Sequence, residues 1–280
     1  MTTPHVISAT DLHKRLEERS VRIIDATVHL SFDEGGAHVE SGRATYLDGH
    51  IPGAVFADQI AGLSDPNGEA PFAAAPSDRF AAAVGALGVG DDTQVVVYDT
   101  VNGIWATRLW WQFRLEGFDD VTVLDGGLAA WVDAGFPTET GDVDVPAASF
   151  TARRRADRIY STTDVATSVD DPAVLLINAL DRDAFAAARI PGSVNVPFGD
   201  LVDESGQLKP VAELREIFDA VGALDESVRP VTYCGGGIAA TAAAFALHVA
   251  GRDDSAVYDG SMNAWTADPD RPLETDSRPS

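Results

Sequence analysis

The chain of 280 residues contains an internal duplication, and this repeat limits the folds that it can adopt. Three segments of the first half recur in the same order in the second half. The pairs are HIPGAV (50–55) with RIPGSV (189–194), VVVYDT (95–100) with PVTYCG (230–235), and VTVLDGGLAAW (121–131) with SAVYDGSMNAW (255–265). Their offsets, from 134 to 139 residues, indicate two tandem domains of one kind rather than a solenoid of short repeats.

Each half is predicted to be an α/β domain with a mostly parallel sheet and helices on both faces. Short apolar runs are typical of buried strands, and longer stretches between them are typical of helices. The expected strands are 23–26, 95–98, 121–124 and 175–179, and the expected helices are 77–87, 105–115, 211–221 and 239–249. Strands that alternate with helices favour parallel pairing, because each crossover returns the chain to the same edge of the sheet.

The segment between the two halves is rich in Asp, Pro, Ala and Arg and has no clear period. We therefore expect a first domain over residues 1–142, a linker over 143–157 and a second domain over 158–280. The segment after Trp265 is polar and contains prolines, so it is predicted to be a loop or frayed.

Charge and hydropathy exclude several classes of function. The net charge of −24 repels phosphate backbones and anionic membrane surfaces, so nucleic acid and lipid are not expected partners. No apolar run reaches the roughly 20 residues that a membrane span needs. The N-terminal segment lacks a basic region followed by an apolar one, as a secretory signal would have, so a cytoplasmic protein is expected.

The only cysteine, Cys234, ends an apolar run and is followed by three glycines and an alanine-rich helical stretch. Glycines allow a loop to turn its N–H groups inward, and the start of a helix adds a positive dipole. Together they form a cradle for an anion, which can be a thiolate or a persulfide. Cys234 is therefore predicted to be a catalytic nucleophile; the alternative is a buried cysteine that only packs the strand against the helix.

The duplication favours the catalytic interpretation. The position that corresponds to Cys234 in the first half is Asp99, which has no thiol. The first domain is therefore predicted to be catalytically silent. A single cysteine also excludes an intrachain disulfide and any site with several cysteine ligands for a metal.

At these residues the chain resembles the tandem rhodanese family, the thiosulfate and 3-mercaptopyruvate sulfurtransferases. The resemblance covers nearly the whole chain and implies two similar α/β domains, of which only the second carries the reactive cysteine. The motifs are GRATYLDGHIPGA (42–54), VVVYD (95–99), TRLWW (107–111), LDGGLAAW (124–131), RIPGSVNVPF (189–198), YCGGG (233–237) and YDGSMNAW (258–265).

The resemblance implies sulfur transfer in two steps. The thiolate of Cys234 takes a sulfane sulfur from a small anionic donor and becomes a persulfide, and an acceptor then removes the sulfur. The expected acceptors are cyanide, a small thiol or reduced thioredoxin, and no metal or organic cofactor is implied. The loop amides would stabilise the persulfide; they belong to Gly235, Gly236, Gly237, Ile238 and Ala239.

The neutral glycines after Cys234 favour 3-mercaptopyruvate as donor, because thiosulfate users of the family tend to carry cations there. Thiosulfate:cyanide sulfurtransferase activity is the alternative. His50 matches a histidine that mercaptopyruvate enzymes place near the cysteine, although it could instead be a surface histidine in a turn.

Family members often carry an Asp-x-Arg pair after the first strand of the second domain, where this chain has Asn178 and Leu180. The mercaptopyruvate enzymes of the family also place a hydroxyl two residues after the cysteine, where this chain has Gly236. Arg182 and Arg189 are the nearby cations that could hold the anionic end of the donor; the alternative is that both are solvated surface arginines.

Two other functions are possible for a cysteine at the end of a strand on such a scaffold. A phosphatase on the same scaffold needs an arginine six residues after the cysteine, and that position is Ala240, which excludes it. A non-catalytic sulfur carrier or binding module would keep Cys234 but show no turnover.

Overall fold

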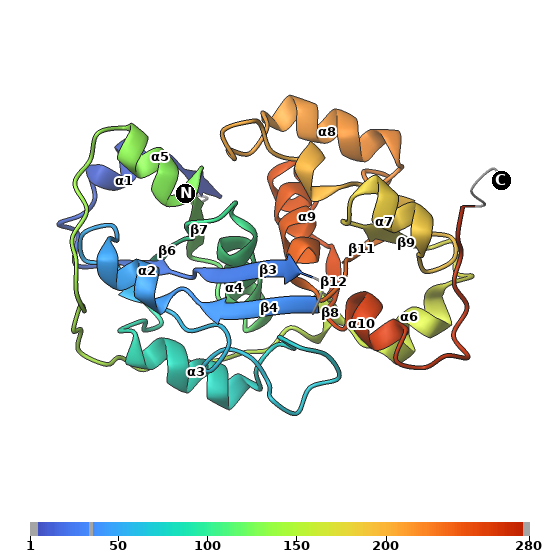
Figure 1. Cartoon of the computed structure of the whole chain (residues 1–280), viewed down its shortest axis with the longest axis horizontal. Coiled ribbons are helices and arrows are strands. Elements are labelled where there is room, and N and C mark those ends of the chain that lie inside the picture. The colour runs from blue at the N-terminus through green and yellow to red at the C-terminus, as the bar shows by residue number, and fades with distance from the viewer. Residues whose placement is uncertain (1–4, 34–35, 277–280) are drawn as a thin grey trace. The chain divides into compact units, whose positions relative to one another are not determined.

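The computed structural model describes residues 5–33 and 36–276, and the chain divides into two compact units (Figure 1). The first unit comprises Met1–Asp65 and Ala74–Arg155, and the second comprises Pro66–Ala73 and Ala156–Ser280. Each unit contains one five-stranded sheet, which confirms the prediction of two α/β domains of one kind. The expected linker at 143–157 stays a prediction, and the segment Pro66–Ala73 was not anticipated to belong to the second unit.

The sheet of the first unit is parallel throughout, with the strand order β1-β7-β6-β2-β5. The three strands predicted in this half are β2, β6 and β7. The bounds are β1 (Val6–Ile7), β2 (Val21–Asp25), β5 (Val55–Phe56), β6 (Gln94–Tyr98) and β7 (Val121–Leu124).

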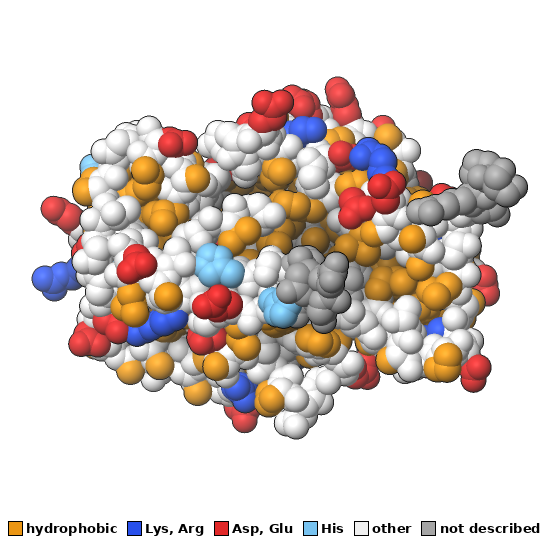
Figure 2. Space-filling view, viewed as in Figure 1, with side chains coloured by type: hydrophobic (Ala, Val, Ile, Leu, Met, Phe, Trp, Pro, Cys, Tyr) orange, Lys and Arg blue, Asp and Glu red, His pale blue; other side chains and the backbone are white. Residues whose placement is uncertain are grey.

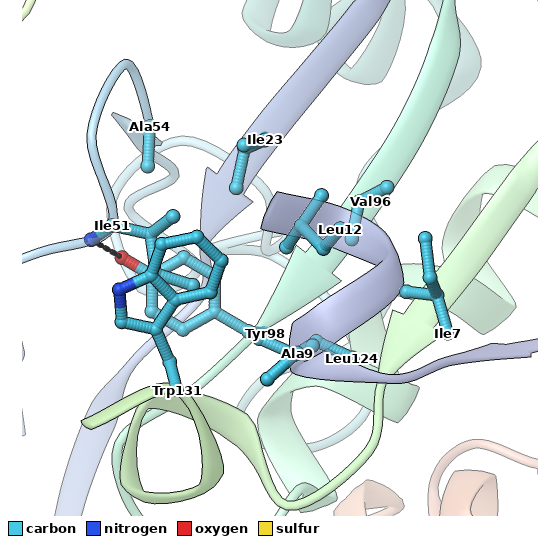
Figure 3. Packing of buried hydrophobic residues seen from close by; sticks show 10 residues of the cluster. All are labelled: Ile7, Ala9, Leu12, Ile23, Ile51, Ala54, Val96, Tyr98, Leu124 and Trp131. Atoms are coloured by element: carbon cyan, nitrogen blue, oxygen red, sulfur yellow. Dashed lines mark hydrogen bonds between the residues drawn. The ribbon is translucent and has the colours of Figure 1, made fainter. Parts of the chain in front are cut away.

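Helices cover both faces of this sheet. Val96 and Tyr98 of β6 point into a buried apolar cluster with Trp131, which also holds residues of α1 (Ala9–His13) and α5 (Gly127–Asp133) (Figure 3). Successive residues of a strand point to opposite faces, so Val95 and Val97 face the other side. There α4 (Ile104–Leu115) packs against β6 and β7.

The remaining elements of the first unit lie outside the sheet. They are α2 (Arg43–Asp48), α3 (Ser77–Ala86) and an antiparallel hairpin of β3 (Val28–Asp33) with β4 (Gly36–Ser41). The hairpin was not predicted, although its first strand alternates apolar and polar residues in the period of a half-exposed strand.

The second unit repeats this plan in the order β10-β9-β11-β12-β8, again all parallel. One face packs α6 (Thr162–Ser168) and α10 (Ser261–Trp265), and the other packs α9 (Ile238–Val249), which also contacts α8 (Val211–Ala220). The strands are β8 (Ile159–Tyr160), β9 (Val174–Asn178), β10 (Val194–Asn195), β11 (Arg229–Tyr233) and β12 (Ala256–Tyr258), and the remaining helices are α7 (Arg182–Ala187), η1 (Ala156–Arg158) and η2 (Phe198–Asp200).

The segment after Trp265 is a loop, as predicted, but residues 266–276 are held in place and are not frayed. The Trp265 Nε1 donates to the Pro272 carbonyl at 3.0 Å, and Glu274 pairs with Arg189 as an isolated β-bridge. Residues 277–280 lie outside the described part of the chain. In the described part, no helix is long and apolar enough to cross a membrane.

The segment Pro66–Ala73 comes from the first half of the sequence but belongs to the second unit. Ala70 is buried in the apolar cluster that contains Tyr258 and Trp265. The Thr162 hydroxyl donates to the Glu69 carboxylate at 2.9 Å and lies 2.9 Å from the Tyr258 hydroxyl. We call this segment the arm; it completes the core of the second unit.

Candidate active site

Cys234 follows β11 directly and leads into the loop 235–237 and then into α9. Its N–H donates to the Ser261 hydroxyl at 3.0 Å, and its carbonyl accepts from the Met262 N–H at 3.0 Å. The Ser261 hydroxyl in turn donates to the carbonyl at the end of β12 at 2.8 Å. The cysteine is 3% exposed, so its backbone is fixed and its thiol is sheltered from bulk water.

Gly237 sets the geometry of the loop. It caps α9 with φ of 83°, in the left-handed region, and a Cβ there would lie 2.4 Å from the carbonyl oxygen of Asp259. Any other residue is therefore excluded both by its backbone conformation and by the adjacent strand end. Gly103 occupies the corresponding place before α4 with φ of 86°, so both units use the same turn.

Replacing Gly237 with Ala is expected to destabilise the protein by about 3 kcal/mol and to lower turnover at least tenfold, because strain and collision displace the loop. Urea unfolding and activity assays measure both effects. Gly222→Ala is the matched control: Gly222 also has positive φ, at 76°, but nothing lies within 4 Å of its added Cβ. It should lose only about 1 kcal/mol and keep full activity. Equal effects of the two changes would contradict the steric argument.

The corresponding loop of the first unit shows what such a cradle binds. The carboxylate of Asp99 accepts four backbone N–H groups, two on each oxygen. Oδ1 accepts from Val101 at 2.8 Å and Gly103 at 2.9 Å, and Oδ2 accepts from Trp105 at 3.0 Å and Ala106 at 2.9 Å. An anion therefore sits where the loop meets the first turn of the helix, as the dipole and the unpaired N–H groups of a helix start favour.

The second unit has the same turn, with Cys234 in place of the Asp99 carboxylate. Within the described part of the chain, the protein supplies no hydrogen-bond acceptor to the N–H groups of Gly236, Ile238 and Ala239. Because Cys234 replaces Asp99, these donors can stabilise an anion that the thiol carries or that a substrate brings. The arrangement supports covalent chemistry at sulfur.

A cavity of about 650 Å³ opens beside this loop. Its wall includes Ala239 from the first turn of α9, Leu180 after β9, and Arg182 of α7. The guanidinium of Arg182 pairs with the Asp200 carboxylate at 2.5 Å, and this hydrogen bond raises the pKa of Arg182. The Arg182 side chain is 71% exposed, which agrees with the alternative of a solvated arginine. A role in holding the donor stays a prediction.

Arg189 is placed differently and is not a solvated surface residue. It is buried, pairs with Glu274 at 3.1 Å and Asp276 at 2.8 Å, and lies over the Phe185 ring at 4.7 Å. These contacts tie the C-terminal segment to the second unit. Arg189 is not among the residues that line the cavity, and its predicted role in donor binding remains untested.

His50 is fully buried, so the alternative of a surface histidine is wrong. Its Nδ1 lies 2.7 Å from the Tyr46 carbonyl oxygen and its ring stacks on the Tyr46 ring at 4.0 Å. Its Nε2 lies 3.3 Å from a carboxylate oxygen of Glu139. These partners belong to the first unit, and a contact of His50 with substrate stays a prediction.

Two residues near the loop were missed or misjudged from the sequence. Asn178, noted only as a departure from the family, is fully buried and accepts the Leu180 N–H at 2.8 Å, which fixes the chain beside the loop. Asn263 donates its backbone N–H to the Gly235 carbonyl at 2.9 Å. Asn263 lies within the motif YDGSMNAW (258–265), but the motif does not show what its side chain contacts, because the pairing of β11 with β12 brings it to the loop.

Comparisons with known proteins agree with this architecture. The model of the rhodanese-like domain matches residues 8–134 and again 161–268. The 3-mercaptopyruvate sulfurtransferase of Escherichia coli (strain K12) is 33% identical, covering 98% of this chain and 99% of that protein. A putative thiosulfate sulfurtransferase of Mycobacterium tuberculosis is 34% identical over 83% of this chain and 85% of its own length.

A solved structure gives the same result for the fold. The crystal structure of a 3-mercaptopyruvate sulfotransferase from Escherichia coli superimposes with a TM-score of 0.83, covering 93% of this chain and 99% of that chain at 33% identity. Two matched domains, full-length relatives and a shared fold lead to one conclusion: the chain belongs to the rhodanese family, with two rhodanese-like domains in tandem.

Proposed function

We propose that the protein is a sulfurtransferase that moves a sulfane sulfur from 3-mercaptopyruvate to a thiophilic acceptor through a persulfide on Cys234. One observation carries this proposal: the cradle that holds the Asp99 carboxylate in the first unit recurs in the second unit around a cysteine. The names of full-length relatives support the same reaction.

In the first step the Cys234 thiolate attacks the sulfur of 3-mercaptopyruvate. A sulfur–sulfur bond forms, the carbon–sulfur bond breaks, and its electron pair moves to the methylene carbon, which takes the thiol proton as pyruvate leaves. The terminal sulfur of the persulfide then carries the negative charge, and the amides of Gly236, Ile238 and Ala239 stabilise it. In the second step the acceptor attacks that terminal sulfur and restores the thiolate.

The charges around the cavity support a donor with a single negative charge. Asp181, Asp183 and Asp200 line it, with Arg182 as a cation that already pairs with Asp200. Acidic side chains are also scattered over the face of the molecule shown in Figure 2, where basic ones are few. A dianion such as thiosulfate meets more repulsion here than the carboxylate of 3-mercaptopyruvate.

Two other functions have specific support. Thiosulfate:cyanide transfer is favoured by the name of the Mycobacterium tuberculosis relative. A non-catalytic sulfur carrier is favoured because, among the described residues that line the cavity, the arginine is Arg182 and it pairs with Asp200. As acceptors we propose cyanide, a small thiol or reduced thioredoxin, and as compartment the cytoplasm; the acidic net charge argues against nucleic acid and anionic membranes as partners.

The test compares the two donors on the unmodified protein. Incubation with 3-mercaptopyruvate should add one sulfur atom by intact mass, and kcat/KM should exceed that for thiosulfate by about tenfold or more, since one added like charge costs roughly 1 kcal/mol or more at short range. A higher kcat/KM with thiosulfate would establish the first alternative. A persulfide without turnover would establish the carrier, and no sulfur gain from either donor would overturn the proposal.

A further inference from the structure

The side chain of Asn263 lies against the sulfur-carrying loop. A Cβ built on Gly236 would be 3.0 Å from the Nδ2 of Asn263. The Met262 N–H donates to the Cys234 carbonyl at 3.0 Å, and the Asn263 N–H donates to the Gly235 carbonyl at 2.9 Å. Two successive backbone bonds therefore fix Asn263 relative to Cys234, and the glycine at 236 leaves room for its side-chain amide.

The amide group of Asn263 is available to a ligand. Asn263 is exposed, and within the described part of the chain its side chain has no hydrogen-bond partner in the protein. An asparagine amide presents two N–H donors and one acceptor. The Asn263 backbone is held by a hydrogen bond, but its side-chain amide has no partner among the residues that the structure describes. The amide can therefore bind an anion without first breaking a hydrogen bond within the protein.

The two arginines predicted to hold the donor, Arg182 and Arg189, are already paired. Arg182 binds Asp200, and Arg189 binds Glu274 and Asp276. A donor anion that approached either guanidinium would have to compete with a carboxylate held at 2.5 to 3.1 Å. A neutral amide has no such competitor and does not attract the acidic side chains around the cavity.

We propose that the Asn263 side-chain amide binds the carboxylate of the sulfur donor while its sulfur faces Cys234, and that it thereby takes the place of an arginine clamp. This rests on the proposed sulfurtransferase function. Gly236 is part of the same site, because a side chain there would displace the amide. The neutral Asn263 amide also favours a monoanionic substrate over a dianion. It supplies hydrogen bonds but no positive charge to offset the second negative charge.

Steady-state kinetics with 3-mercaptopyruvate and a thiol acceptor test this proposal. Asn263→Ala should raise KM for the donor about tenfold, the loss of one hydrogen bond to a charged group, and leave kcat and the acceptor KM within about twofold. Asn263→Asp, which has the same shape, should raise the donor KM further, to about a hundredfold, by like-charge repulsion. Asn102→Ala, at the exposed loop of the first unit, is the matched control and should change nothing.

A double-mutant cycle separates binding from loop geometry. Gly236→Ala alone should raise the donor KM by displacing the amide, but it should add little in the Asn263→Ala background, where the added methyl group has room. If the unmodified protein forms a persulfide and Asn263→Ala keeps the donor KM, this inference is overturned while the proposed function stands. A fall in kcat at constant KM would equally overturn it, because that result indicates a positioning role. If the unmodified protein forms no persulfide, the proposed function itself fails.

Discussion

The Cys234→Ser protein is expected to gain no sulfur from 3-mercaptopyruvate and to lose turnover by at least about a thousandfold, because the hydroxyl cannot form the covalent intermediate. The loop amides remain but have no sulfur anion to stabilise. Since Cys234 is the only cysteine, no other thiol can take over, and intact mass with and without donor gives an unambiguous result.

The serine variant should remain folded. The hydrogen bonds at this position, to Ser261 and from Met262, involve only backbone atoms of Cys234. A thermal unfolding curve that matches the unmodified protein is the control. Sulfur gain or turnover above the uncatalysed rate in the folded variant would show that transfer does not pass through a cysteine persulfide.

Replacing Asp99, which is bound by four N–H groups in the first unit, is expected to have a large effect on stability. Asp99→Ala is expected to lower the free energy of unfolding of the first unit by about 4 kcal/mol, since four N–H groups lose their acceptor and each buried unpaired donor costs roughly 1–3 kcal/mol. Asp99 is buried and two of its donors, Trp105 and Ala106, are buried at the start of α4. Urea unfolding followed by tryptophan fluorescence measures this loss.

Two variants separate the cradle from general charge effects. Asp203→Ala removes an exposed carboxylate that accepts the N–H groups of Ser205 at 2.8 Å and Gln207 at 3.1 Å, and should cost less than about 1 kcal/mol. Asp99→Asn keeps one acceptor oxygen, so its loss of unfolding free energy should lie between those of Asp203→Ala and Asp99→Ala. If Asp99→Ala were as mild as Asp203→Ala, the first-unit loop would not be an anion cradle.

Much of the fold could be predicted because its signals are local. The runs at 95–98 and 121–124 are short and β-branched, which suits strands buried on both faces, and they became β6 and β7. The helices α4 and α9 were predicted to within a residue of their starts. The repeat strengthened these predictions, because the strand and helix patterns of each half support the same fold for the other half.

What could not be predicted depends on contacts between distant segments. The partners of Arg189 lie in the C-terminal segment, which composition alone marked as frayed. His50 is buried by Tyr46 and Glu139, and neither residue signals this in the sequence. At the site, Cys234 and its glycines form one continuous motif and could be predicted. The contact of Asn263 with the loop could not, because it depends on the pairing of β11 with β12.

The arm has a consequence for synthesis of the chain. Ala70 leaves the ribosome early, but Tyr258 and Trp265, which share its apolar cluster, are made almost 190 residues later or more. N-terminal domains generally fold first during translation, so the first unit can form while its arm still lacks a binding surface. The second unit then folds around the arm, which has already been synthesised. A fragment that starts at residue 156 lacks this segment, so the second unit is not a self-contained module of the chain.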